Sequence, residues 1–512
     1  MITTVNPEIF RQYDIRGIFN KDLTTEVAEA IGRAYGLYLL QQLKELNKLN
    51  KPKVSIGRDV RLSSSALRDA LIKGIISTGV DVVDIGECPT PLQYFSLYHL
   101  ALDGGIMITG SHNPPEFNGF KISIGRETIF GEEIQKIRRI VENSKQQTVS
   151  SKQKKRGGLE YYDIIPTYID YVKKQFAALV SDKVTMKIVV DAGNGTAGLV
   201  APDILRKLGC QVIELFCKPD GNFPNHHPDP TIPDNLKLLI ETVKKQVADL
   251  GIAYDGDADR IGVVDENGRI IWGDELMIIF ARDILRQGSG RGQGTEKPIF
   301  VGEVKCSQVM YDEIKRIGGN AIMWKTGHSL IKSKMKETNA LLAGEMSGHM
   351  FFADRYFGYD DAIYASCRLI EILSKHKSRD PDTRFSSLLS GLPKTYTTPE
   401  IRIDCPDDKK FKVIDRLSEI IGQIFPSPLA GEGQGEGGLS GGNIKILDTI
   451  KIDGLRIIFD NGWALIRASN TQPVLVLRFE STTEKDLKDI RNLVEEKLSR
   501  AISAIFYTNS IK

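Results

Sequence analysis

The stretch GGIMITGSHNPPEFNGFKI, residues Gly104–Ile122, carries the signals that decide both fold and chemistry in this chain of 512 residues. Gly-Gly followed by Ile-Met-Ile-Thr predicts a short buried strand that ends at Gly110. Ser111 follows at a sharp turn, and the two prolines after Asn113 stiffen the chain because each ring fixes φ and donates no backbone N–H. A small hydroxyl on a rigid loop at the end of a parallel strand is well placed for covalent chemistry.

Ser111 has two other interpretations. An esterase nucleophile elbow needs glycine two residues on either side of the serine, but Thr109 and Asn113 stand there, which excludes that class. A Ser-His-Asn-Pro turn without chemistry stays open for these residues taken alone. Lys121, in the Asn-Gly-Phe-Lys segment, can return to the same loop. The stretch therefore indicates a nucleophile without naming the reaction.

The composition of the whole chain sets the class of protein. Its 68 basic and 66 acidic residues are nearly balanced, which argues against a general nucleic-acid binder. Its six cysteines form no CxxC pair, so neither a zinc knuckle nor a disulfide framework is indicated. The chain shows no apolar run of membrane-spanning length and no signal region at its start. We expect a soluble cytoplasmic enzyme, a monomer or small homo-oligomer, with neither nucleic acid nor membrane as a partner.

Strands alternate with helices along most of the chain, which predicts sheets covered by helices on both faces. After about Lys394 the pattern changes to strand-rich hairpins and a final charged helix. We therefore expect an α/β protein with three similar mixed α/β domains and a C-terminal α+β domain around a central cleft. The expected boundaries are 1–160, 161–268, 269–390 and 391–512.

A glycine-rich turn, DAGNGTAG at Asp191–Gly198, follows a predicted strand and satisfies the GxGxxG pattern. Because a strand-to-helix turn of this kind can bind a dinucleotide, a nicotinamide enzyme is a serious alternative at this point. The other interpretation is a turn whose glycines serve close packing only. A second GxGxxG lies in the low-complexity segment 427–442, which predicts a flexible insertion, as does 287–297.

The strongest chemical signal is GIAYDGDADRIG, at Gly251–Gly262. Its three carboxylates at alternate positions, Asp255, Asp257 and Asp259, would repel one another unless the backbone loops around a cation. Oxygen ligands alone favour Mg²⁺ or another hard divalent ion. An EF-hand is excluded because its sixth position, which needs glycine, is Arg260, and because the flanks are typical of strands rather than helices.

Two further sets of polar residues lie in loops of the predicted third and C-terminal domains. The first set follows short strands in the third domain and comprises Lys305, His328, Glu345, Ser347 and His349, although each histidine taken singly is more typical of a structural residue. The second, in the C-terminal domain, is GWALIRASNTQP at 462–473. Its arginine, hydroxyls and turn amides predict a site for phosphate.

Taken together, these loops resemble the α-D-phosphohexomutase superfamily, and within it the phosphomannomutase/phosphoglucomutase group. The motifs that carry the resemblance occur in the family's order from about residue 10 to residue 473: FRQYDIRG, GRDVRLSS, TGSHNPP with FNGFKI, DAGNGTAG, DGNFPNHHPDP, DGDADR, TGHSLIK, GEMSGH and RASNTQP. The resemblance favours packing over dinucleotide binding for DAGNGTAG. It implies an isomerase that interconverts hexose 1-phosphates and hexose 6-phosphates.

The resemblance also implies roles for single residues. Ser111 would be a phosphoserine that donates and recovers a phosphoryl group through a hexose 1,6-bisphosphate. Asp255, Asp257, Asp259 and an oxygen of phosphorylated Ser111 would hold Mg²⁺. Lys121, His328 and His349 are the candidates for proton transfer, with acid and base not assigned. The residues expected to bind the hexose phosphate are Tyr13, Arg16, Arg260, Lys305, Glu345, Met346, Ser347, Gly348, Arg467, Ser469, Asn470 and Thr471.

Two alternative classes remain at this stage. A dehydrogenase would change nicotinamide absorbance with a sugar substrate, whereas a catalytically inactive sugar-phosphate binding protein would bind without turnover. Intact Ser111 and all three aspartates speak against the second class. Neither the preference between mannose and glucose nor the oligomeric state follows from the sequence.

Overall fold

A computed structural model describes residues 5–47, 50–143, 156–181, 185–288, 297–424, 444–470 and 472–507. The chain forms two compact units. The first comprises Met1–Val301, Ile317–Asn320 and Gly327–Ser390, and the second comprises Gly302–Arg316, Ala321–Thr326 and Gly391–Lys512. The predicted insertion at 427–442 and most of 287–297 lie outside the described residues. The expected domain boundaries remain predictions.

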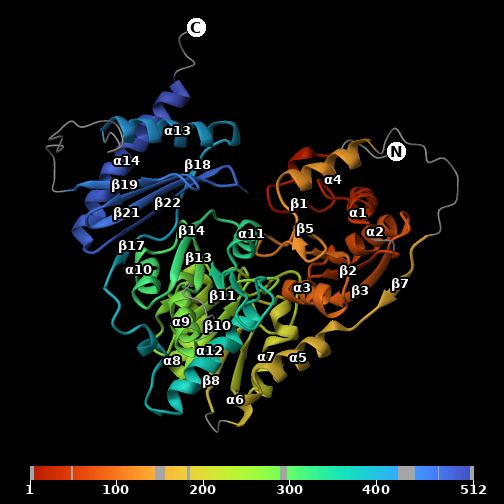
Figure 1. Ribbon diagram of the computed structural model, residues 1–512, viewed down its shortest axis with the longest axis horizontal. Helices are drawn as coiled ribbons and strands as arrows, with labels where there is room; N and C mark the ends of the chain where they lie inside the picture. The colour runs from red at the N-terminus through yellow and green to blue at the C-terminus, as the bar shows by residue number, and fades with distance from the viewer. Residues whose placement is uncertain are drawn as a thin grey trace. The chain divides into compact units, whose positions relative to one another are not determined.

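The N-terminal part of the first unit is built on a mixed sheet of seven strands, in the order β1-β5-β4-β2-β3-β7 with β6 beside β5. Figure 1 labels β1, β5, β2, β3 and β7 of this sheet. Strands β4, β2, β3 and β7 run parallel, whereas β5 is antiparallel to both β4 and β1. The elements are η1 (Pro7–Ile9), β1 (Ile15–Ile18), α1 (Thr25–Glu45), β2 (Lys53–Arg58), α2 (Ser64–Ile76), β3 (Asp81–Glu87), α3 (Thr90–His99), β4 (Gly104–Ile108), β5 (Phe117–Ile124), β6 (Glu127–Thr128), α4 (Glu132–Asn143) and β7 (Leu159–Tyr161).

Helices α1, α2 and α4 pack together over this sheet, and α3 packs against β2 and β4. Two glycines let α1 and α2 approach closely, since a Cβ at Gly32 would lie 2.2 Å from the Leu71 carbonyl oxygen and one at Gly74 would lie 2.1 Å from that of Glu29. Every residue of β4 is buried, as expected for a central strand with parallel and antiparallel neighbours. This buried strand fixes the position of the loop that carries Ser111.

A second sheet, in the order β12-β11-β10-β8-β9, follows in the first unit. Strand β8 is parallel to β9 and β10, whereas β11 is antiparallel to β10, so the chain reverses directly through the acidic loop 255–260. The elements are α5 (Ile164–Gln175), α6 (Ala177–Ser181), β8 (Lys187–Asp191), η2 (Thr196–Leu199), α7 (Ala201–Lys207), β9 (Gln211–Leu215), η3 (Pro233–Leu236), α8 (Lys237–Gln246), β10 (Leu250–Tyr254), β11 (Ile261–Asp265) and β12 (Ile270–Ile271).

A third α/β segment follows β12. Its strands β15 and β16 pair antiparallel, and they bracket the GEMSGH loop. The elements are α9 (Gly273–Gln287), β13 (Ile299–Glu303), α10 (Gln308–Arg316), β14 (Asn320–Trp324), α11 (His328–Thr338), β15 (Leu342–Gly344), β16 (Met350–Phe352), α12 (Ala362–Lys377) and η4 (Phe385–Leu389).

The C-terminal part of the second unit is an antiparallel sheet, β17-β22-β21-β20-β19 with β18 beside β22, packed against α13 and α14. Its core is aliphatic and aromatic, with Leu417, Phe479 and Val494 fully buried. The elements are β17 (Tyr396–Thr397), β18 (Ile401–Asp404), α13 (Asp407–Ile424), β19 (Ile446–Ile450), β20 (Leu455–Phe459), β21 (Gly462–Ala468), β22 (Val474–Ser481) and α14 (Glu484–Tyr507). The expected α+β domain is therefore present.

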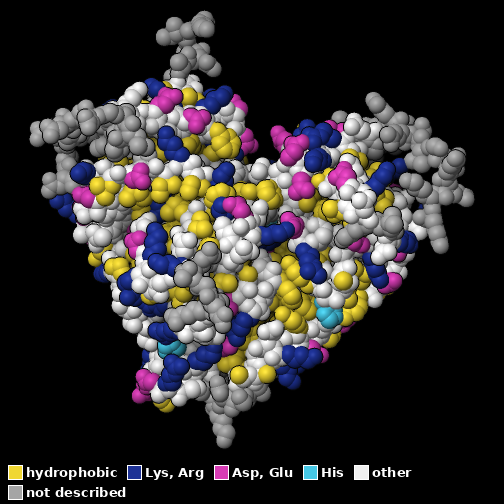
Figure 2. Space-filling model, viewed as in Figure 1, with side chains coloured by type: hydrophobic (Ala, Val, Ile, Leu, Met, Phe, Trp, Pro, Cys, Tyr) yellow, Lys and Arg dark blue, Asp and Glu magenta, His cyan; other side chains and the backbone are white. Residues whose placement is uncertain are grey.

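Charged side chains of both signs are interspersed on the face shown in Figure 2, in line with 68 basic and 66 acidic residues in the chain. Among the described helices, none has the length and apolar character needed to cross a membrane.

Candidate active site

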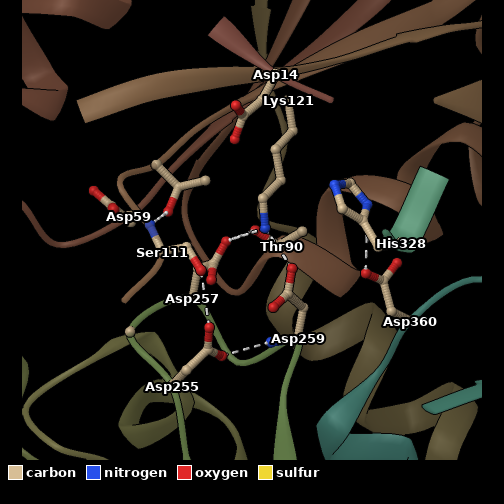
Figure 3. Close-up of polar contacts among 12 residues, drawn as sticks. Asp14, Asp59, Thr90, Ser111, Lys121, Asp255, Asp257, Asp259, His328 and Asp360 are labelled. Carbon is tan, nitrogen blue, oxygen red and sulfur yellow. Dashed lines mark hydrogen bonds and ion pairs between the residues drawn. The ribbon is translucent and has the colours of Figure 1, made fainter. Parts of the chain in front are cut away.

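Ser111 lies just beyond the end of β4, on a loop with an unusual backbone conformation. Its φ is +49°, in the left-handed region that residues with a Cβ rarely adopt. Its N–H donates to Thr109 Oγ1 at 2.8 Å, and its hydroxyl donates to Asp255 Oδ2 at 2.9 Å. The serine hydroxyl is therefore buried and directed at the acidic loop (Figure 3).

The acidic loop brings together three aspartates that follow β10. One carboxylate oxygen from each of Asp255, Asp257 and Asp259 lies within 4.8 Å of the others, and all three residues are fully buried. Asp255 Oδ1 shapes the turn by accepting the N–H groups of Asp259 and Arg260, each at 3.1 Å. The sequence prediction that the backbone would gather these carboxylates is confirmed.

The chemistry of this cluster fits a bound cation. Asp257 Oδ1 and Asp259 Oδ1 are buried and have no hydrogen-bond partner among the described residues. Burial raises the pKa of Asp255 well above its ordinary value, and the carboxylates of Asp259 and Asp257 raise it further. A hard divalent cation would satisfy the unpartnered oxygens and offset the repulsion. The residues present are therefore suited to holding a metal cofactor.

Lys121 projects from β5 into the same cluster. Its Nζ lies 2.7 Å from Asp257 Oδ2 and also pairs with Asp259. Burial alone would lower the pKa of Lys121, but Asp257 and Asp259 together raise that pKa well above its ordinary value. Thr90 completes this side of the cluster by donating its hydroxyl to Asp257 Oδ2 at 2.5 Å. Lys121 is therefore a protonated ammonium that compensates part of the acidic charge.

Arg260 and His349 join the acidic loop to the GEMSGH loop. The two residues form an isolated β-bridge, and Arg260 Nε donates to His349 Nε2 at 2.9 Å. On the other side of the ring, His349 Nδ1 lies 3.2 Å from Asp360 Oδ2. Gly348 permits the close approach, since its φ is +95° and a Cβ there would lie 2.2 Å from the Ile261 carbonyl oxygen.

Glu345 is the acidic residue of the GEMSGH loop. Its Oε1 accepts the N–H of Gly327 at 2.6 Å, and its Oε2 lies 3.4 Å from Ser347 Oγ. Glu345 is buried, whereas Met346 and Ser347 are half-buried. The carboxylate is thus held by a backbone amide of the neighbouring TGHS loop.

His328 begins α11 and faces the same aspartate as His349. Its Nδ1 lies 3.8 Å from Asp360 Oδ2, while Lys332 Nζ lies 3.1 Å from Asp360 Oδ1. Burial lowers the pKa of His328 well below its ordinary value, and the Lys332 charge lowers it further. His328 is therefore neutral at pH 7.

Tyr13 and Arg16 come from the FRQYDIRG segment. The ring of Tyr13 packs edge-on against that of His328, with centroids 6.3 Å apart. Arg16 donates to Asn113 Oδ1 at 3.1 Å and pairs with Asp14 at 2.5 Å. Both residues thus lie among the loops of the first unit that carry the site.

The loop predicted to bind phosphate, at 462–473 in the second unit, is described up to Asn470 and from residue 472. Thr471 lies outside the described residues. Arg467 Nε donates to Asp453 Oδ2 at 3.0 Å. The buried ammonium of Lys410 binds the Gln472 carbonyl at 3.1 Å and also that of Ser469. Lys305, elsewhere in this unit, lies 3.2 Å from Glu400 Oε2, and chiefly for that reason the pKa of Glu400 is lowered to about 2.

The space beside the glycines of DAGNGTAG is filled by other parts of the protein backbone. A Cβ at Gly195 would lie 2.6 Å from the Gly256 carbonyl oxygen, and one at Gly198 would lie 1.9 Å from that of Cys217. A short 3₁₀-helix, η2, follows the turn and leads directly into α7. The close backbone contacts at these glycines support the packing interpretation of the turn over dinucleotide binding.

Sequence reasoning missed several residues that organise the site. Asp59 and Arg61 lie in the quoted segment GRDVRLSS, yet no role was drawn from them. Thr90 and Asp360 could not be identified from the sequence, because neither lies in a recognisable motif and each contacts its partners only in the folded chain. The same holds for Lys410 in the second unit.

A four-part α/β chain with a buried serine hydroxyl directed at three clustered aspartates has the architecture of a metal-assisted phosphoryl-transfer enzyme. Comparison with known proteins agrees with this class. Models of the phosphoglucomutase/phosphomannomutase alpha/beta/alpha domains I, II and III match residues 7–148, 166–268 and 272–396, and the model of the C-terminal domain matches residues 400–497.

Similar whole proteins lead to the same family. A phosphomannomutase/phosphoglucomutase of Pseudomonas aeruginosa is 44% identical over 503 residues, covering 98% of each chain. A phosphoglucomutase of Neisseria gonorrhoeae is 42% identical over 491 residues, covering 96% of each chain. The crystal structure of a phosphoglucomutase/phosphomannomutase family protein from Burkholderia thailandensis superposes with a TM-score of 0.80 at 37% identity over 98% of each chain. The chain belongs to the phosphoglucomutase/phosphomannomutase family of isomerases.

Proposed function

We propose that this protein interconverts hexose 1-phosphates and hexose 6-phosphates, with glucose and mannose as the sugars. The reaction passes through phosphorylated Ser111 and a hexose 1,6-bisphosphate. The observation that carries the proposal is the hydroxyl of Ser111, held 2.9 Å from Asp255 at the edge of a metal-type cluster. A hydroxyl so directed is arranged for phosphoryl transfer rather than for acyl chemistry.

We assign Mg²⁺ as the cation, held by Asp255, Asp257, Asp259 and an oxygen of phosphorylated Ser111. When bound, it neutralises charge on the transferring phosphoryl group. The chain contributes its own cations: Lys121 pairs with two of the carboxylates, and the guanidinium of Arg260 interacts electrostatically with Asp255 and Asp259.

In the first half-reaction the free hydroxyl of the sugar attacks the phosphorus of phosphorylated Ser111. The new sugar O–P bond forms as the bond from phosphorus to Ser111 Oγ breaks, and the proton lost by the sugar hydroxyl balances the one that Ser111 regains. His328, which is neutral, is suited to accept such a proton, whereas Lys121 is protonated and suited to stabilise negative charge. His349 remains the second candidate for proton transfer. The second half-reaction reverses these steps at the other end of the sugar.

The remaining loops would bind the sugar phosphate. Arg467, Ser469, Asn470 and Thr471 bind the phosphate that does not react, and Lys305, Arg16 and Tyr13 contribute further polar contacts. The GEMSGH loop, with Glu345, Met346, Ser347 and Gly348, binds sugar hydroxyls. Because the bisphosphate must rebind turned around, contacts that serve both orientations fall on O3 and O4, which are nearly equivalent under the rotation.

A coupled assay that follows hexose 6-phosphate formation from glucose 1-phosphate and mannose 1-phosphate tests the proposal. We expect turnover of both sugars that needs Mg²⁺ and a trace of hexose 1,6-bisphosphate. Binding of hexose phosphate without turnover, in phosphorylated protein supplied with Mg²⁺, would contradict the proposed function.

A further inference from the structure

Arg61 stands immediately behind the Ser111 loop, in the segment between β2 and α2. The residue is 2% exposed, and all five N–H donors of its guanidinium are engaged. Nε donates to Asp59 Oδ2 at 3.1 Å, and one of the other bonds, from Nη2 to the Ser111 carbonyl, is 2.8 Å long. The acceptors of the four Nη bonds are the backbone carbonyls of Ser111, Asn113, Pro114 and Phe117.

These four carbonyls lie in the connection from β4 to β5, from Ser111 to the first residue of β5, and that connection contains the strained residue. Ser111 has φ +49°, a conformation that a residue with a Cβ keeps only where its surroundings hold it. Pro114 donates no N–H, and the next residue, Pro115, donates none either, so few backbone bonds can fix the turn from within. The guanidinium supplies the missing bonds from outside the loop.

Arg61 is closely packed on several sides. A Cβ at Gly110 would lie 2.4 Å from Arg61 Cζ, so glycine is required there for the guanidinium to fit. The ring of Phe223 covers it from another side, with its centroid 5.1 Å away. Asp59 ties the backbone of Arg61 to the start of the Ser111 loop, because its carboxylate accepts the backbone N–H groups of both Arg61 and Gly110, each at 3.0 Å.

We propose that Arg61 is a positioning residue for phosphoryl transfer, which holds the Ser111 backbone in the left-handed conformation that directs its hydroxyl at the acidic cluster. The inference rests on the proposed function of Ser111. Arg61 acts only through the loop backbone, since each of its five donors is already bonded to Asp59 or to a loop carbonyl. Removing the guanidinium of Arg61 should therefore slow phosphoryl transfer at both ends of the sugar without weakening the binding of substrate.

Lysine is the discriminating substitution, because it keeps the charge but cannot reproduce a planar fork with five donors. Arg61→Lys should lower kcat by about 100-fold, the size of effect that a misplacement of about 1 Å has on a reacting group, while KM stays within about threefold. The rate at which hexose 1,6-bisphosphate phosphorylates the protein, followed by intact mass, should fall by the same factor. The apparent affinity for Mg²⁺ should not change.

Arg368 offers a matched control in the same unit. It is fully buried on α12 and pairs with Asp354 at 2.9 Å, away from the Ser111 loop. Arg368→Lys should lower the Tm, as any loss of a buried guanidinium does, but leave kcat of the folded protein within about threefold. In Arg61→Ala, added guanidinium ion at a concentration below the unfolding transition should restore part of the lost kcat, and in Arg368→Ala it should not.

The outcomes separate the proposals. Wild-type protein that neither turns over nor accepts phosphate on Ser111 contradicts the proposed function itself. Active wild type together with an Arg61→Lys variant whose kcat stays within about threefold of wild type overturns the positioning role alone. Equal losses of kcat in the Arg61 and Arg368 variants overturn it as well. Should Arg61→Lys not fold, Asp59→Asn removes the anchor of the guanidinium, and an unchanged kcat in that variant overturns the proposal.

Discussion

In two loops of this protein a buried cationic side chain binds backbone carbonyls of the loop, but the two cations constrain the loop backbone to different degrees. The Ser111 loop in the first unit is tied to a buried arginine by four carbonyls, and one of its residues is forced to φ +49°. The RASNTQP loop in the second unit is tied to a buried lysine, Lys410, by the carbonyls of Ser469 and Gln472. The planar guanidinium of Arg61, with five donors in fixed directions, fixes the orientation of the loop backbone. The ammonium of Lys410 can rotate, so it mainly supplies a positive charge close to the carbonyls.

The difference follows the work that each loop is proposed to do. Ser111 must present one oxygen atom along a line of attack, so a small displacement costs rate. Arg467 and its neighbours must bind a phosphate that does not react, and binding by charge tolerates small displacements. Changes near the first loop should therefore lower kcat, and changes in the second loop should raise KM.

The largest effect should come from the acidic cluster that faces the Ser111 loop. Asp257→Asn removes one carboxylate charge and a partner of Lys121, so kcat should fall by about 100- to 1000-fold, which corresponds to several kcal/mol of lost transition-state stabilisation. Excess chelator should silence the wild type, and added Mg²⁺ should restore it. Full activity of the chelated wild-type protein would show that the cluster holds no required cation.

In the second loop, Arg467→Ala should raise KM for glucose 1-phosphate by about 10- to 100-fold, the equivalent of one charged hydrogen bond. We expect kcat to stay within about tenfold of wild type. Arg416→Ala is the control, because this exposed arginine on α13 pairs only at the surface with Glu419 at 2.7 Å. A large fall in kcat with KM unchanged would contradict the division between the loops.

Lys410→Met should have a smaller effect of the same kind. It leaves Arg467 in place but removes the ammonium that binds the carbonyls of Ser469 and Gln472. We expect KM to rise by about three- to tenfold, the equivalent of about 1 kcal/mol, with kcat unchanged. If Lys410→Met instead lowers kcat as much as Arg61→Lys does, the two anchors serve the same purpose and the comparison fails.

The smallest effect should be on the choice between sugars. Glucose and mannose differ only at C2, a hydroxyl with no equivalent after the bisphosphate turns around, so kcat/KM for their 1-phosphates should differ by about 100-fold or less. Glu345→Ala should reduce both values and leave their ratio within about threefold. A preference above about 10⁴, or a variant that loses only one epimer, would show that a dedicated group reads C2.

The sequence predicted the parts of the site that lie in single stretches. Asp255, Asp257 and Asp259 stand in one loop, and their alternate positions in the sequence predicted that the backbone would bring them together around a cation. Ser111, the proposed nucleophile, could be picked out in the same way, because it follows a predicted strand and precedes two prolines. The three α/β domains and the C-terminal α+β domain followed from the strand and helix pattern together with the family motifs.

The anchors could not be predicted in this way, since they act across the fold. Arg61 binds carbonyls about fifty positions away in sequence. Thr90 binds Asp257 across 167 positions. Lys121 was expected to transfer protons beside Ser111, and only the structure shows its ammonium against two aspartates. Such contacts depend on which strands become neighbours, and composition and spacing do not determine that.

The most direct measurement of the central claim is the location of phosphate on the protein during turnover. Wild-type protein incubated with glucose 1,6-bisphosphate and Mg²⁺ should carry one phosphate, mapped by peptide mass spectrometry to Ser111 and lost on addition of excess glucose 1-phosphate at the rate of turnover. Ser111→Ala should carry none, and its kcat should fall by about 10⁴-fold or more while its unfolding free energy changes by less than about 1 kcal/mol. Turnover without phosphate on Ser111, or a Ser111→Ala variant with most of the wild-type kcat, would contradict the account.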